Sequence, residues 1–92
     1  MSRIERTLEE TFKVELLTPI SFLRGVAASR NVYAKLSGGM VIFYEDVDAD
    51  LVFLQNWRID DLGSVDVHTT ESVSQLLAYD KRGEKLFSFD IE

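Results

Sequence analysis

The spacing of apolar residues near the start of the chain predicts one short helix. Three of them recur every four positions and therefore share one helical face: Ile4, Leu8 and Phe12. Ser2 stands three residues before Glu5, which is the spacing of a capping box at a helix start. We therefore expect a helix over residues 3–12.

The next segment predicts a second helix after an ambiguous stretch. Residues 12–17 alternate apolar and polar side chains, which fits a half-buried strand as well as a continued helix. Pro19 sets a boundary, because a proline ring disfavours helical backbone at Thr18 and suits the first position of a new helix. We expect that helix over residues 19–29, where it would present Ile20, Leu23 and Ala27.

From residue 31 the apolar period changes to two, which predicts antiparallel strands. Residues 31–37 and 40–45 alternate around Gly38 and Gly39, and this pair accepts the positive φ of a two-residue hairpin turn. DVDAD predicts an acidic loop before the strand LVFLQ, and NWRIDDLG predicts a bend or a single helical turn before SVDVHT. SVSQLLAYD and EKLFSFDI predict a second hairpin around the turn Asp80–Gly83.

These elements predict an α+β fold: one or two short N-terminal helices followed by an antiparallel sheet of five to seven short strands, or a small open barrel. A chain of 92 residues buries one core, so we expect a single domain over residues 1–92. Because so small a sheet leaves edge strands to cover, we also expect a homodimer.

Composition excludes several classes of protein. The chain has no cysteine, which excludes disulfides, thiolate metal sites and a cysteine nucleophile. It has no apolar run long enough to cross a membrane, and MSRIERTLEE lacks the apolar run of a signal peptide, so we expect a cytoplasmic protein.

The net charge of −6 is unevenly distributed along the chain. Residues 1–44 carry six basic and four acidic side chains, whereas residues 45–92 carry four basic and twelve acidic ones. Binding to nucleic acid depends on Lys and Arg, so we expect none. The acidic half instead predicts recognition of a protein partner with a basic surface, as in an immunity protein, inhibitor or antagonist. The candidate residues are Glu45, Asp46, Asp48, Asp50, Trp57, Asp60, Asp61 and Asp66.

Asp46, Asp48 and Asp50 also have the spacing with which a calcium loop begins. Such a loop requires glycine at its sixth position and glutamate at its twelfth, where this chain has Leu51 and Trp57. We therefore favour a solvated hairpin loop and expect no metal site.

His68 is the only histidine and lies in SVDVHT, where alternation directs it outward beside Asp66. No nucleophile motif accompanies it, so we expect no catalytic residues and no enzyme activity. A lone histidine can still act as an axial haem ligand.

Three segments, DADLVFLQNW, WRIDDLGSVDV and ESVSQLLAYDKRGEKLFSFDI, occur in an order that resembles the haem-utilisation family of intracellular haem carriers and hemin-degrading factors. The resemblance covers residues 22–91 and includes the apolar residues that flank the Asp80–Gly83 turn: Leu76, Leu77, Tyr79, Leu86 and Phe87. It implies a split antiparallel sheet, dimerisation and haem binding or trafficking. No histidine of this chain matches the family's haem ligand.

Two functional hypotheses follow. The first is a non-catalytic protein-binding module that needs no cofactor. The alternative is an intracellular haem carrier, in which basic residues would hold the propionates and an apolar sheet face would hold the ring. Its candidate ligand-binding residues are Arg24, Arg30, Lys35 and His68.

Overall fold

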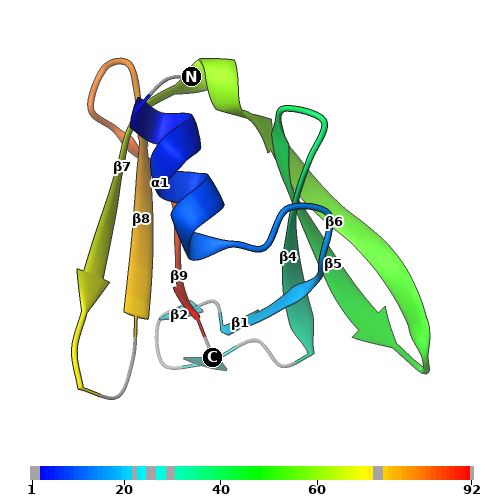
Figure 1. Ribbon diagram of the computed structural model, residues 1–92. Coiled ribbons are helices and arrows are strands. Elements are labelled where there is room, and N and C mark those ends of the chain that lie inside the picture. The colour runs from blue at the N-terminus through cyan, green and yellow to red at the C-terminus, as the bar shows by residue number, and fades with distance from the viewer. Residues whose placement is uncertain (1–2, 22, 25–26, 29–30, 72–73, 92) are drawn as a thin grey trace.

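The computed structural model describes residues 3–21, 23–24, 27–28, 31–71 and 74–91. Its elements in chain order are α1 (Arg3–Thr11), β1 (Thr18–Ser21), β2 (Leu23–Arg24), β3 (Ala27–Ala28), β4 (Val32–Ser37), β5 (Met40–Val47), β6 (Asp50–Arg58), the 3₁₀ helix η1 (Ile59–Asp61), β7 (Leu62–Thr69), β8 (Ser74–Asp80) and β9 (Lys85–Ile91) (Figure 1).

Seven strands form one antiparallel sheet in the order β6-β5-β4-β1-β9-β8-β7. It consists of two three-stranded meanders, β4-β5-β6 and β7-β8-β9, and β1 joins them by pairing with both β4 and β9. Strands β2 and β3 form a separate two-stranded sheet. The coarse prediction of an α+β fold with an antiparallel sheet is confirmed, although the helical part is small.

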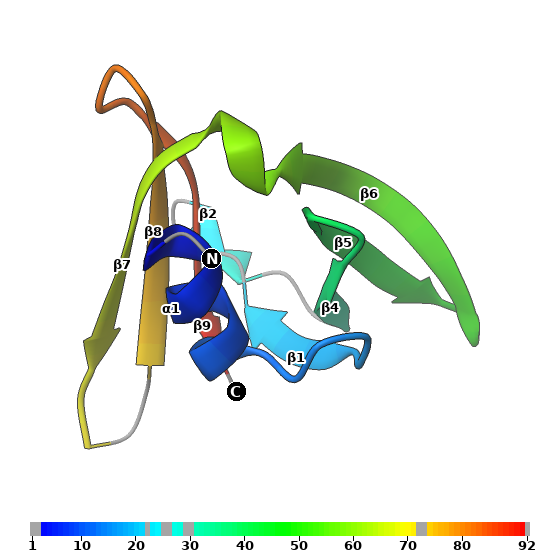
Figure 2. The same cartoon turned by 45° about the horizontal axis from the view of Figure 1, so that its top comes forward.

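The two edges of the large sheet follow each other in the chain. Strand β6 leads through η1 directly into β7, yet the two strands are not paired with each other. Figure 2 shows β6 as a long curved strand that approaches β7 only at the η1 end. The sheet is therefore strongly curved but not closed into a barrel, and among the described strands β6 and β7 form its two edges.

The first predicted helix is confirmed as α1, which ends one residue earlier than expected, at Thr11. Leu8 and Phe12 are buried in the core, and the Phe12 ring lies 5.8 Å from that of Phe89 in β9. Helix α1 lies across the hollow side of the sheet (Figure 1). Ser2, the expected cap, lies outside the described residues.

The second predicted helix, over residues 19–29, is wrong. Three strands, β1, β2 and β3, lie in this segment. Ile20 is buried because it pairs with Val32 on one side and with Ile91 on the other. Pro19 is tolerated where β1 has one partner strand, since only Ile20 and Ser21 pair with β9. Pairing between distant segments has overridden the local helix signal.

Residues 12–17 form neither of the two structures that their pattern allowed. After α1 the chain turns, and Glu15 has a φ of 66°. The Glu15 N–H donates to the carbonyl oxygen of Leu36 at 2.9 Å, so the turn is held against the end of β4. Val14, Leu16 and Leu17 remain exposed.

Both predicted hairpins are confirmed. Gly38 and Gly39, with φ of 59° and 75°, connect β4 to β5. In the second hairpin, between β8 and β9, Asp80 Oδ1 accepts the N–H groups of Arg82 at 2.8 Å and Glu84 at 2.9 Å. The predicted single helical turn is η1.

The core lies between the concave sheet face and α1. Phe43 in β5 makes edge-on contacts with Phe87 and Phe89 of β9, at centroid distances of 5.2 and 5.6 Å. These two strands lie in different meanders, so the aromatic cluster holds the halves of the curved sheet together.

Candidate functional site

The most unusual surface of the molecule is the free edge strand β6. Four consecutive apolar side chains along it are between 42% and 56% exposed: Leu51, Val52, Phe53 and Leu54. The strand carries no charged side chain between Asp50 and Arg58. Edge strands of soluble proteins usually carry charges, prolines or a covering element, because a bare apolar edge invites pairing with another chain.

This edge is apolar on both faces, and a bulge interrupts its pairing. Gln55 pairs with Phe43 and Phe53 pairs with Tyr44, so Leu54 stands between them without a partner in the register. Beyond the bulge, Phe53 lies on the face of Tyr44, with the two rings 6.5 Å apart. Val52, its neighbour, points to the opposite face. We name this distal part of the hairpin, residues 44–54, the β5–β6 arm.

Four of the predicted partner-binding residues lie on this arm. Asp48 and Asp50 are exposed at its tip, and Glu45 and Asp46 are half-buried in β5. The Asp46 N–H donates to the Asn31 carbonyl oxygen at 2.8 Å. In Figure 1 the tip of the arm points away from α1 and from the meander β7-β8-β9. The arm therefore carries both exposed apolar side chains and four acidic residues.

The acidic segment DVDAD forms the expected exposed hairpin connection, but the loop is shorter than the segment. Asp46 and Val47 belong to β5, Asp50 belongs to β6, and Asp48-Ala49 form a two-residue turn with φ of 52° and 71°. Asp46 pairs with Leu51 and Asp50 pairs with Val47, which directs the two carboxylates to opposite faces. Within the described part of the chain, no group of three or more His, Asp or Glu side chains is placed to hold a metal ion.

The remaining predicted partner-binding residues lie elsewhere. Asp60 and Asp61 are exposed in η1, and Asp66 is exposed on β7, the opposite edge of the sheet. Trp57 points inward and packs on Phe87, with ring centroids 6.0 Å apart. The eight predicted residues thus form one group on the arm and scattered positions beyond it.

The basic residues and the histidine proposed for haem are also spread over the fold. Lys35 in β4 forms an ion pair with Glu15 at 3.9 Å, whereas His68 is exposed on β7. Three strands, β1, β9 and β8, separate β4 from β7. Arg24 belongs to β2, and Arg30 lies outside the described residues. The structure does not bring the described residues of this set together into one site. Haem binding remains an untested hypothesis.

The sequence did not predict that the four apolar residues of the arm are exposed at the surface. LVFLQ was expected to be a strand, and it is one. Its run without alternation was the available signal, but such a run is equally typical of a strand buried on both faces. Only its place at the end of the strand order shows that it is exposed.

No helix in the described residues is long and apolar enough to cross a membrane. Comparison of the chain with models of protein families, with curated proteins and with solved structures finds no match. The arm is therefore the feature on which a function can be argued.

Proposed function

We propose that this protein is a non-catalytic binding module that recognises an extended segment of another protein along β6. The observation that carries the proposal is the run of four exposed apolar side chains on a free edge strand, with Phe53 at 56% exposure. An edge strand presents unpaired N–H and C=O groups, so a partner strand that adds to it gains backbone hydrogen bonds and side-chain contacts together.

The charge of the arm defines the chemistry of the partner. Its carboxylates, Glu45, Asp46, Asp48 and Asp50, lie beside the apolar side chains. A complementary segment has apolar residues in its centre and Lys or Arg residues around them. The apolar contacts supply affinity, and the charges speed association and reject acidic competitors.

A pair of synthetic peptides tests this proposal. We expect a nine-residue peptide of alternating valine and lysine to bind in a fluorescence titration, and the matching peptide of valine and glutamate not to bind. Binding weakens as salt is added, because screening shortens the reach of the carboxylates. Only every second N–H group of the bound peptide faces β6. N-methylation of that set of peptide bonds is expected to abolish binding.

Matched variants of the protein locate the site. Phe53→Ser removes an apolar contact from the arm, so we expect it to weaken peptide binding at least about tenfold. Val14 is also about half exposed, at 50%, but lies in the turn after α1, and Val14→Ser leaves binding unchanged. Equal loss in the two variants, or equal binding of the basic and acidic peptides, contradicts the proposal.

A further inference from the structure

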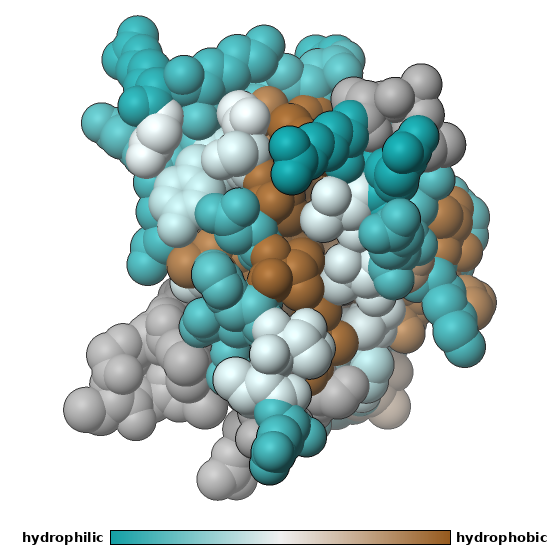
Figure 3. Space-filling view, turned by 60° about the vertical axis from the view of Figure 1, so that its left-hand side comes forward, coloured by the Kyte–Doolittle hydropathy of each residue, from teal (hydrophilic) through white to brown (hydrophobic). Residues whose placement is uncertain are grey.

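The opposite edge of the sheet, β7, is free as well but has a different character. Among the described strands, β7 pairs only with β8, and its outward side chains Ser64, Asp66 and His68 are exposed. On the concave face Val67 is 37% exposed, although it lies opposite the fully buried Leu76. Figure 3 turns this side of the molecule forward and shows apolar atoms in a band between hydrophilic ones.

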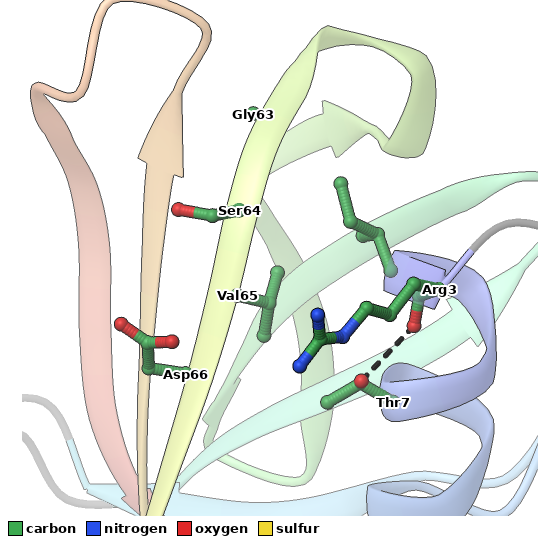
Figure 4. Close-up of a pocket in the computed structure, with 7 residues that line it drawn as sticks. Arg3, Thr7, Gly63, Ser64, Val65 and Asp66 are labelled. Carbon is green, nitrogen blue, oxygen red and sulfur yellow. Dashed lines mark hydrogen bonds between the residues drawn. The ribbon is translucent and has the colours of Figure 1, made fainter.

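A groove lies along the free side of β7. It has a volume of about 400 Å³ and lies between the strand and α1, with this lining: Arg3, Ile4, Thr7, Gly63, Ser64, Val65 and Asp66. The Arg3 side chain extends from α1 into the space beside β7 (Figure 4). Its guanidinium forms no ion pair with a described residue. Among the described residues, the groove therefore offers a strand edge with no partner strand and a guanidinium with no ion pair.

We infer that a second copy of this chain occupies the groove, through antiparallel pairing of the two β7 strands about a two-fold axis at Val67. In that register Asp66 of each copy lies opposite His68 of the other, and Val67 lies opposite Val67. Asp66 and His68 are on the same face, so the imidazole N–H of one copy can donate to the carboxylate of the other. The symmetry forms this pair twice.

Charge excludes one neighbouring register. The two concave faces stay on one side of the joined sheet only when the axis passes through a residue, because side chains alternate along a strand. An axis at Asp66 would place two carboxylates opposite each other, which is destabilising. The axis at Val67 opposes no like charges and brings together two partly exposed valines.

The same register gives the Arg3 guanidinium an acidic partner. Counting outward from Val67, Gly63 of one copy lies opposite Glu71 of the other. Gly63 and Arg3 line the same groove, so Glu71 of the second copy approaches the Arg3 guanidinium. This contact can form without displacing a described ion pair, because Arg3 has none.

Crosslinking tests the position of the axis. Directly opposed residues of antiparallel strands have Cα atoms about 4.5 to 5.5 Å apart, within the range of roughly 4.4 to 6.8 Å that a disulfide spans. The chain has no cysteine, so Val67→Cys introduces a single thiol. We expect mild oxidation to convert this variant largely into a covalent dimer. Phe53→Cys, an exposed position on the other edge, stays monomeric on a non-reducing gel.

A charge exchange tests the pairing itself. Sedimentation equilibrium from about 1 to 500 μM measures the dimer dissociation constant of the cysteine-free chain. His68→Glu places two carboxylates opposite each other twice, and Asp66→Lys removes the carboxylate that accepts from His68, so each is expected to raise this constant about tenfold. The double variant places the introduced lysine and glutamate opposite each other and returns the constant to near its original value.

A chain that stays monomeric over this range, or a dimer that the single variants leave unchanged, overturns the inference. Crosslinking through Phe53→Cys in place of Val67→Cys assigns self-association to β6 and overturns it as well. None of these outcomes bears on peptide binding by the arm, because the two edges are separate surfaces.

Discussion

Gly63 in β7 lies so close to the backbone of Asp80 in β8 that a Cβ atom on it would overlap the Asp80 carbonyl oxygen. The overlap would extend to the carbonyl carbon of Asp80 and to the Cα of Lys81, all of them backbone atoms. The register of β7 against β8 shifts between Leu62 and Ser64, at this contact. Glycine is therefore required here for space, at the point where the chain leaves η1 and enters the second meander.

Substitution of Gly63 is expected to separate β7 from β8. Gly63→Ala should lower the free energy of unfolding by more than about 2 kcal/mol, because backbone atoms cannot move away as a flexible side chain can. Gly38→Ala is the control: its φ is 59° but nothing lies near its added Cβ, so it should cost only about 1 kcal/mol. Urea unfolding followed by Trp57 fluorescence measures both, and equal losses would contradict the contact.

Ala49 is strained at the tip of the arm. It has a φ of 71° in a two-residue turn, a conformation that glycine adopts without a steric penalty. We expect Ala49→Gly to raise the free energy of unfolding by about 0.5 to 1 kcal/mol in thermal or urea unfolding. The same change at the buried Ala34 in β4 should lower it. A loss of stability in Ala49→Gly would show that the turn differs from this geometry.

The carboxylate of Asp80 orders the β8–β9 turn. Its Oδ1 accepts two backbone N–H groups, from Arg82 and Glu84. Asp80→Ala removes the acceptor and should cost about 1 kcal/mol or somewhat more. Asp80→Asn keeps a side-chain oxygen in the same place and should cost less than half as much. Unfolding curves that coincide for the two variants would mean that these hydrogen bonds contribute little.

Substitutions of Phe43 and Phe53 distinguish a residue that stabilises the core from one that belongs to the proposed recognition surface. Phe43 is 1% exposed within the aromatic cluster, so Phe43→Ala should lower the free energy of unfolding by about 3 to 5 kcal/mol. Phe53 is 56% exposed, and Phe53→Ala should change it by less than about 1 kcal/mol. Thermal unfolding compares them, and a large loss in Phe53→Ala would mean that the arm serves the core.

Hemin titration tests the alternative hypothesis of a haem carrier. Lys35 and His68 lie on strands separated by three others, so we expect no change in the Soret band that depends on His68. The measurement compares the unchanged chain with His68→Ala at equal hemin concentration. A shifted Soret band that His68→Ala reduces would support haem binding and argue for a ligand set other than the one proposed.

Segments whose pattern and turn chemistry agree could be predicted from the sequence. The apolar stripe of α1 and the glycine pair at 38–39 each carry a local physical cause, namely a shared helical face and a backbone that accepts positive φ. Asp80 and Gly83 are local turn signals of the same kind for the second hairpin, where Gly83 has a φ of 86°. Such causes act within a few residues and need no knowledge of the rest of the chain.

The segment 18–24 could not be predicted in this way. Pro19 and the spacing after it favour a helix. Strand pairing of Ile20 with both Val32 and Ile91, at the junction of the two meanders, stabilises the segment more than a local helix would. Those partners lie 12 and 71 residues further along the chain. The pattern of apolar residues within the segment therefore cannot predict these pairing partners.

The sequence by itself determined which residues form α1 and both predicted hairpins, because helix stripes and turn conformations depend on near neighbours. The tertiary structure decided which strands are central and which are edges. Burial of Phe43 and exposure of Phe53 follow from strand order, although both lie in apolar strand sequences. Strand order depends on contacts between distant segments, and it makes β6 an apolar edge and β7 a polar one.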